Sequence, residues 1–448
     1  MKKQIGIIGG GVSGLLVAIN LLRNGTDREV LVTLIEREFS QAARGVAYSP
    51  RSKQHLLNVI AGRMSAFSTQ PDHFVKWLEA SGYNFSAQDF VPRCIYGEYL
   101  DAQKESLLKD FSGCFNIVHD SICELKKTDK KIILQGSTHQ STYDQVVLAI
   151  GNQAPADLPV FGSLSSQLAT YYSNPWKVDA RELLAHESIA IIGSGLTSFD
   201  LIIDLIKLDY QGKIHVLSRR GLRPQSHPNS FTALSLSLPE LTGSLRSNLR
   251  KFVSWLRSDP QDWQLRFDLI RPQTQNLWRN LTLKEQQRFL RHIAPFWDTH
   301  RHRVDPKIYA LVQKGIFDSK LRFVAARIVS AKHNSISNQI ELNYKLRGDR
   351  AGVIHQLNVG AIINCTGPDS LGRSKDPLLV NLLATRQIII DPLGIGVETD
   401  AKGRVLDGSR CPSNIWTLGA LRKGQLWESN AVNEIRTQAE ALAKVLLA

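Results

Sequence analysis

The sequence predicts an α/β fold with two parallel-sheet domains and a helical elaboration on the second. A strand–glycine-turn–helix pattern occurs at residues 4–22 and again at residues 188–208. Each copy begins with a continuous apolar run, which is typical of a strand buried on both faces of a parallel sheet. Because the two units lie about 180 residues apart, we predict two Rossmann-like dinucleotide-binding domains rather than one.

The pattern divides the chain into three predicted segments. Residues 1–160 form the first part of one domain, and residues 161–355 form the second domain. A tryptophan- and arginine-rich stretch with helical periodicity, at about residues 228–310, is predicted to be an insertion in this second domain. Residues 356–448 are predicted to return to the first domain. Apolar runs that end at Gly151, Gly367 and Gly419 supply further strands.

Composition argues against several classes of protein. The 448 residues are 43% hydrophobic and 21% charged, and no apolar run reaches the roughly 20 residues of a membrane span. No cleavage signal follows the basic start, so we expect a cytoplasmic protein without a membrane partner. The net charge of +14 comes from dispersed residues, so we expect no nucleic acid. The five cysteines form no Cys-x-x-Cys, which disfavours a zinc site and a dithiol centre.

The first glycine turn favours FAD. Its residues run Gly9, Gly10, Gly11, Val12, Ser13 and Gly14, and Glu36 ends the next strand. Backbone N–H groups of such a turn approach a pyrophosphate at the start of a helix, and the acid accepts hydrogen bonds from ribose hydroxyls. An acid here would repel a 2′-phosphate, so the ligand is FAD or NAD. The N-terminal place of the turn and the later glycine-ended strands favour FAD.

The second glycine turn favours NADPH. It runs Gly193, Ser194, Gly195, Leu196, Thr197 and Ser198, with serine in place of the third glycine. The strand that follows ends at Arg219 and Arg220, where an NAD site would place an acid. Planar arginine side chains suit a 2′-phosphate. The alternative is that both are solvated loop residues.

Several longer strings carry a family resemblance. They are Arg44-Gly45-Val46-Ala47-Tyr48, residues 55–59 with 61–65, Phe90-Val91-Pro92-Arg93 before Tyr96-Gly97, residues 218–222, residues 288–292 before 297–303, and Leu426-Trp427-Glu428 before Glu434-Ile435-Arg436. Over essentially its whole length the chain resembles the FAD-NAD(P)-binding proteins. These are distantly related to class B flavin monooxygenases and bacterial amino-acid N-hydroxylases.

The resemblance implies where the cofactors bind. It places Arg44 to Tyr48, Leu57 and Asn58 along FAD, with Met64 nearby. The linker histidine of class B monooxygenases is missing after Phe161-Gly162, and Ala420 replaces the usual acid after Gly419. The remaining predicted cofactor-binding residues are Arg37, Ile122, Gly151, Gly367, Gly419, Trp427 and Glu428.

Three features have competing interpretations. His300-Arg301-His302 is typical of a helix end rather than a metal site, because arginine opposes a cation; we predict no metal. The tryptophans at positions 255, 263, 278 and 297 favour helix packing over a stacking platform. Glu428 and Glu434 frame the last helix, where acids stabilise the helix dipole, although a catalytic role stays open.

The leading functional prediction is an FAD- and NADPH-dependent oxidoreductase. Within this class, the sequence favours a monooxygenase. It would form a C4a-hydroperoxyflavin and transfer oxygen from O₂ to a small amine or thiol. One alternative is a reductase that passes electrons to a quinone or a protein. Another is a flavin-bound redox sensor without turnover. No set of catalytic residues and no oligomeric state is predicted.

Overall fold

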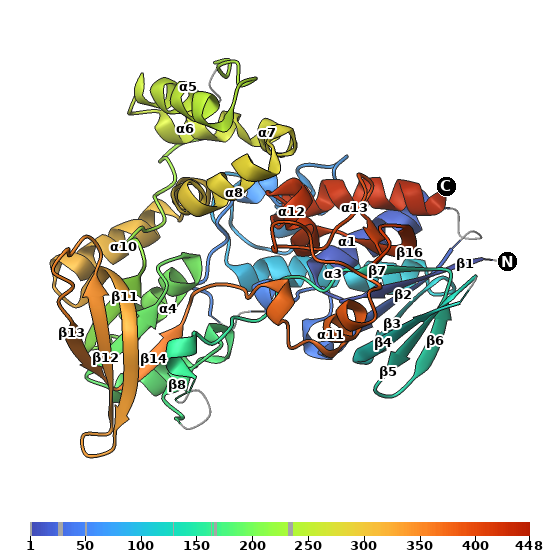
Figure 1. The fold of residues 1–448 in the computed structure, drawn as a ribbon. Coiled ribbons are helices and arrows are strands. Elements are labelled where there is room, and N and C mark those ends of the chain that lie inside the picture. The colour runs from blue at the N-terminus through green and yellow to red at the C-terminus, as the bar shows by residue number, and fades with distance from the viewer. Residues whose placement is uncertain are drawn as a thin grey trace.

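The structure of the chain is a computed structural model, and it describes residues 2–25, 30–49, 52–128, 130–162, 164, 168–231 and 236–448. Two sheet domains lie side by side, and a group of helices lies above the junction between them (Figure 1). Both chain ends lie at the far edge of the first domain.

The first domain is built on a six-stranded sheet in the order β15-β16-β7-β1-β2-β3. Five of the strands are parallel, and β15 is antiparallel to β16. The strands are β1 (Lys3–Ile8), β2 (Val30–Glu36), β3 (Phe115–His119), β7 (Gln145–Leu148), β15 (Arg404–Leu406) and β16 (Pro412–Thr417). A smaller antiparallel sheet joins β4 (Ile122–Lys127), β5 (Ile132–Gly136) and β6 (Gln140–Tyr143).

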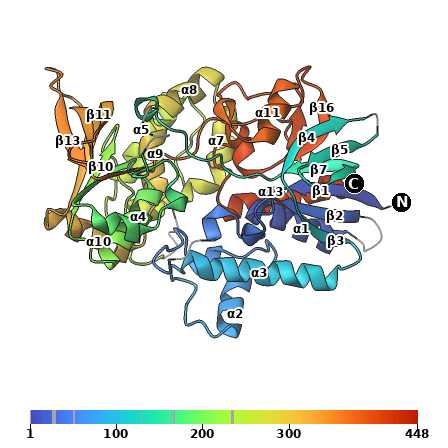
Figure 2. The same cartoon turned by 90° about the horizontal axis from the view of Figure 1, so that it is seen from below.

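Helices cover both faces of this first sheet. One face packs against α1, α3 and α13, and the other packs against the small sheet and α11. In Figure 2, α2 and α3 lie together at the lower edge of the picture, beside α1. The helices of this domain are α1 (Val12–Asn24), α2 (His73–Ala80), α3 (Arg93–Asp110), α11 (Pro377–Ala384), α12 (Lys423–Leu426) and α13 (Val432–Leu447).

The second domain contains a seven-stranded sheet in the order β13-β12-β11-β10-β9-β14-β8. Its strands are β8 (Tyr171–Tyr172), β9 (Ser188–Ile192), β10 (Lys213–Ser218), β11 (Leu321–Asn334), β12 (Gln339–Leu346), β13 (His355–Val359) and β14 (Ala361–Asn364). One face packs against α4 (Leu196–Lys207) and α10 (Pro306–Phe317). Strands β8, β14, β9, β10 and β11 are parallel to one another. Strand β12 is antiparallel to both of its neighbours, β11 and β13.

The second sheet extends past the boundary predicted at residue 355. Strands β13 and β14 both belong to it, because β14 pairs with β9 and β8. The chain therefore returns to the first domain only after Asn364. The sequence could not show this, because an apolar run that ends at glycine fits either sheet equally well.

In the described residues between β10 and α10, five α-helices form the helical insertion. They are α5 (Leu245–Arg257), α6 (Trp263–Leu269), α7 (Thr274–Asn280), α8 (Leu283–His292) and α9 (Ala294–Arg301). These helices do not simply extend the second domain. The Trp278 ring stacks on Trp427 of the first domain at 5.2 Å, and its Nε1–H donates to the carbonyl of Gly424 at 2.8 Å. The helical insertion therefore connects the two sheet domains.

Candidate functional site

The first glycine turn has the geometry of a pyrophosphate cradle. Gly9 has φ +101°, which L side chains rarely adopt. A Cβ on Gly14 would lie 2.1 Å from the carbonyl oxygen of Gly9, so only glycine lets α1 approach the strand this closely. Helix α1 begins after Gly11 without a side-chain cap. Its first backbone N–H groups are therefore left for an anion.

Glu36 is fixed beside this turn at the carboxyl end of β2. Its Oε2 accepts a hydrogen bond from the Gly10 N–H at 2.6 Å, and its Oε1 accepts one from the Glu38 N–H at 3.0 Å. The side chain is buried. The backbone thus holds the carboxylate in one orientation, as recognition of a ribose requires.

Residues 43–48, which include the string Arg44 to Tyr48, fold back onto the first glycine turn. The Ala43 N–H donates to the Gly10 carbonyl at 2.7 Å, and a Cβ on Gly11 would lie 3.3 Å from the Gly45 Cα. Val46, Ala47 and Tyr48 form a short 3₁₀ helix after Gly45. Arg44 binds Asp101 of α3 at 2.6 Å. Its guanidinium is therefore already paired with an acid.

Two of the glycine-ended strands also meet the first turn. A Cβ on Gly419 would lie 3.5 Å from Ser13 Oγ, so β16 ends against the start of α1. The Gly419 N–H donates to Gln438 Oε1 at 3.0 Å, which ties it to α13. Gly151 follows β7, and a Cβ there would enter open space. The carboxyl edge of the first sheet thus has room for a ligand.

The second glycine turn repeats this geometry, and the structure explains its serine. Gly193 has φ +105° and abuts the carbonyl of Cys365 at the end of β14. Ser198 Oγ donates to the Gly195 carbonyl at 2.6 Å. The serine therefore adds a hydrogen bond within the turn, which a glycine at this position could not form. Helix α4 begins at this turn with no side-chain cap. A Cβ on Gly195 or Gly367 would enter open space.

The two predicted arginines differ in their surroundings. Arg219 is exposed at the end of β10, and its carbonyl accepts from Arg347 at 3.4 Å. Arg220 donates to the carbonyl of Arg291 in α8 at 2.8 Å. Arg219 is therefore the better placed cation for a phosphate, and Arg220 joins the strand end to the helical insertion.

Side chains of the second domain bind residues 52–58 of the first domain, a segment that includes Leu57 and Asn58. Asp204 of α4 accepts from Ser52 Oγ at 2.7 Å and pairs with His55 Nε2 at 2.7 Å. Asp200, one turn earlier, binds Arg93 at 2.8 Å, and Arg93 in turn donates to a carbonyl in this segment. Helix α4 leaves the second glycine turn directly, so these contacts fix that turn relative to the first domain.

His227 is a contact residue that the sequence did not reveal. Its Nε2 lies 3.0 Å from the carbonyl of Asn58. Burial, and then the nearby Arg303 cation, lower the pKa of His227 to about 3. A carbonyl can only accept, so the neutral ring carries its proton on Nε2. No motif marks His227, because its importance comes from a partner in the other domain.

Four predicted cofactor residues have other contacts. Arg37 pairs with Asp376 at 2.8 Å. Ile122 is the first residue of β4, and its side chain is buried in the core that the small sheet shares with the main sheet. Trp427 has φ +60°, and its ring is buried against Trp278 and Phe289 of the helical insertion. Both oxygens of Glu428 accept bonds from that insertion. Leu57 and Met64 are buried in the main core of the first domain.

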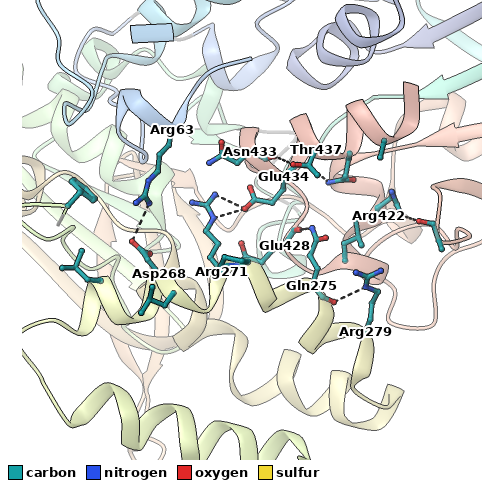
Figure 3. A pocket seen from close by; sticks show the side chains of 18 residues that line it. Arg63, Asp268, Arg271, Gln275, Arg279, Arg422, Glu428, Asn433, Glu434 and Thr437 are labelled. Atoms are coloured by element: carbon teal, nitrogen blue, oxygen red, sulfur yellow. Dashed lines mark hydrogen bonds and ion pairs between the residues drawn. The ribbon is translucent and has the colours of Figure 1, made fainter. Parts of the chain in front are cut away.

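A cavity of about 730 Å³ lies between the helical insertion and the first domain. Its wall holds a buried charged network (Figure 3). Glu428 accepts from Trp297 Nε1 at 2.8 Å and from Arg301 Nε at 3.0 Å. Glu434 accepts from Arg271 at 2.9 Å and lies 3.5 Å from Arg301. Of the two acids, Glu434 is in the first turn of α13, whereas Glu428 precedes that helix.

His300, which the sequence offered as a possible metal ligand, has structural partners. The His300 ring packs against Trp263 at 5.1 Å and against Phe267, and its Nδ1 lies 2.8 Å from the Phe296 carbonyl. Within the described ranges, no three His, Cys, Asp or Glu side chains gather as metal ligands would. In the same ranges, each helix is too short or too polar to cross a bilayer.

Comparison with known proteins identifies the first domain. Residues 6–153 match the model of the FAD-NAD(P)-binding family. These residues are similar to an FAD-NAD(P)-binding domain, and they make up the first part of the first domain. They contain the first glycine turn, Glu36 and Gly151. No curated protein matches the sequence significantly.

Solved structures extend the likeness to the whole chain. The ornithine hydroxylase of Pseudomonas aeruginosa has a TM-score of 0.68 at 15% identity, with 100% of this chain and 99% of that chain covered. The ornithine N-hydroxylase of Kutzneria sp. 744 has a TM-score of 0.67 at 14% identity, covering 100% and 99%. The bacillithiol disulfide reductase of Staphylococcus aureus has a TM-score of 0.57 at 13% identity, covering 100% and 98%.

These matches confirm the predicted fold class and recognition: the chain has the fold of two-dinucleotide flavoproteins. The predicted FAD and NADP(H) cofactors and the oxidoreductase class agree with them. The geometry fits both cofactors on this chain's own residues, because each glycine turn opens an uncapped helix beside glycines that face open space.

The closest contact in the first turn gives a direct test of flavin binding. Gly14→Ala places its Cβ against the Gly9 carbonyl, so α1 must shift and the cradle must open. We expect the purified variant to carry several-fold less flavin, measured as the ratio of visible to ultraviolet absorbance. Gly113→Ala is the matched control, because a Cβ there meets nothing within 4 Å. Equal flavin content in the two variants would contradict the assignment.

The contact between the domains is predicted to depend on pH. Burial alone would lower the pKa of His55, but the bond to Asp204 and the charges of Asp200 and Asp204 outweigh it and raise the pKa. The stabilisation is therefore full below the unfolded value of about 6.5 and is lost as pH rises through the raised pKa. Asp204→Asn should lower the urea midpoint more at pH 5.5 than at pH 9.

The control for this pH dependence is Asp209→Asn. It removes an exposed carboxylate just after α4, at a backbone conformation that asparagine tolerates. A difference between wild type and Asp204→Asn that grows with pH would overturn the sign given above.

Proposed function

We propose that this chain is an FAD- and NADPH-dependent monooxygenase that hydroxylates a small amine. The main support is the cavity where the helical insertion meets the first domain, beside the segment that contains Met64. The helical insertion closes one side of this cavity through the bonds of Glu428 and Glu434. A substrate held there would be partly shielded from bulk water between the helical insertion and the first domain.

The neighbouring structures favour an amine substrate. The hydroxylases from Pseudomonas aeruginosa and Kutzneria act on ornithine, and the Kutzneria structure holds reduced FAD, NADP⁺ and L-ornithine together. A further neighbour, from Erwinia amylovora, is a cadaverine monooxygenase with a TM-score of 0.65 at 12% identity, covering 100% of this chain and 94% of that one. We therefore propose a primary amine in preference to a thiol.

Bound FAD and NADPH would supply the reducing equivalents and the activation of oxygen. The chain's own residues would bind and orient them. The two glycine turns and Glu36 would hold the diphosphates and a ribose. Asp200 and Asp204 would fix the position of the second turn relative to residues 52–58. The overall reaction consumes the amine, O₂, NADPH and a proton, and yields the hydroxylamine, water and NADP⁺.

The disulfide reductase alternative has less support. Cys365, the cysteine beside the second turn, is buried, which raises the pKa of its thiol. A protonated, buried thiol is a poor nucleophile for exchange. A reductase that passes electrons to a quinone stays the competing proposal.

Turnover with a panel of amines tests the proposal. The protein, loaded with FAD, is mixed with NADPH, air and ornithine, lysine or cadaverine, and the hydroxylamine is measured by mass spectrometry. We expect close to one product per NADPH with one class of amine. If every amine leaves all electrons in H₂O₂, and a quinone accepts them faster than O₂, the reductase alternative holds instead.

Coenzyme selectivity is predicted to depend on Arg219. Arg219→Ala removes an exposed cation at the end of β10. The loss of a charge-assisted hydrogen bond should raise KM for NADPH by roughly 10- to 100-fold. KM for NADH should change little, because NADH lacks the 2′-phosphate. Arg327→Ala, an exposed arginine on the neighbouring strand β11, is the control. An equal rise for both coenzymes in Arg219→Ala would contradict the assignment.

A further inference from the structure

Two arginines lie on the part of the cavity wall that is formed by α7 and by the turn before α12. Arg279 lies on α7 of the helical insertion, and Arg422 lies in the first domain just before α12. Both line the 730 Å³ cavity. Figure 3 shows them together at the side opposite Arg63.

Arg422 is buried but has no acid bound to it. Its side chain is 6% exposed. Its Nε donates to Gln425 Oε1 at 2.9 Å, and a terminal nitrogen donates to the Ala401 carbonyl at 3.0 Å. Both acceptors are neutral. Burial of a guanidinium without a counter-charge is costly, and it lowers the pKa of Arg422 to about 10.

Arg279 also binds only neutral groups, and it lies close to Arg422. Its bonds go to the Gln275 carbonyl at 3.3 Å and to Asn276 Oδ1 at 2.8 Å, both on its own helix. Its positive charge adds to the lowering of the Arg422 pKa, so the two like charges repel each other. Arg271 on the same cavity wall differs, because the carboxylate of Glu434 pairs with it.

Asp400 attracts Arg422 more strongly than Arg279 repels it, but among the described residues it forms no ion pair with Arg422. The charge of Asp400 favours the protonated Arg422, but its Oδ1 accepts from the backbone N–H groups of Lys402 and Arg404 at 2.9 Å. In the described part of the chain, neither Arg279 nor Arg422 forms an ion pair with a carboxylate. An anion from outside the chain would supply the missing charge.

We propose that Arg279 and Arg422 form a binding subsite for the anionic group, a carboxylate or a phosphate, of a small molecule in the cavity. Two guanidiniums that face one cavity suit a planar or tetrahedral oxyanion. The subsite goes beyond the proposed function, because it needs neither a bound flavin nor oxygen. The anion could belong to the tail of the amine substrate or to a separate effector.

Titration with small anions tests the subsite without turnover. Inorganic phosphate and succinate are titrated calorimetrically into wild type, Arg279→Ala and Arg257→Ala. Arg257 is an exposed arginine on α5 of the same helical insertion and serves as the control. Both variants are made in an Arg219→Ala background and compared with Arg219→Ala itself, so that phosphate binding by Arg219 does not contribute. Arg220 is kept, because it joins β10 to the helical insertion.

We expect saturable binding of at least one anion, with Kd about 10-fold weaker in Arg279→Ala than in the Arg257→Ala control. Arg422→Lys should weaken binding as well, because it keeps the charge and loses the planar fork. Arg279 is exposed, so its variant should keep the thermal midpoint of the control. Equal affinity in Arg279→Ala and Arg257→Ala, or no saturable binding of either anion, would overturn the subsite.

A second measurement separates the two sources of the anion. Amine turnover is measured with the anion that binds. Competition with the amine, seen as a raised KM at constant kcat, assigns the subsite to the substrate's own tail. A changed kcat without competition assigns it to an effector. The calorimetric result stands by itself if no amine is turned over, so failure of the proposed function is distinguishable from failure of the subsite.

Discussion

The shape of the cavity depends on the buried ionic contact between the helical insertion and the end of the first domain. Arg301 donates to Glu428, and Arg271 donates to Glu434, with all four side chains largely removed from water. Such charges lose hydration on burial, so each needs its partner to remain favourable. Loss of one member would leave the other charge unpaired. The network therefore specifies one position of the helical insertion.

Aromatic packing supports the same position. Trp427, next to Glu428, adopts φ +60°, which is unfavourable for a large side chain. Its ring lies between Trp278, Phe289 and the ammonium of Lys423. Strain of this kind persists only where surrounding contacts fix the residue. The backbone between α12 and α13 is thus shaped by helices that belong to the second domain in sequence.

Contact between the two sheet domains is concentrated on residues 52–58. Three side chains of the second domain, those of Asp200, Asp204 and His227, reach this segment or Arg93 beside it. The same helix that carries the two acids begins at the second glycine turn. An altered domain orientation would therefore break these contacts and move the second turn relative to residues 52–58. This coupling links coenzyme binding to the surroundings of the proposed flavin site.

The sequence alone determined the two cofactor turns and the fold built around them, while only the tertiary structure decided how they are joined. The glycine turns, Glu36 and the strand end at Arg219 are local patterns, because each depends on neighbours within one βαβ unit. The partners of Arg44, Trp427 and Glu428 lie elsewhere in the chain, so spacing could not reveal them. Membership of β14 in the second sheet and the closeness of Arg279 to Arg422 likewise arise from chain segments that meet only on folding.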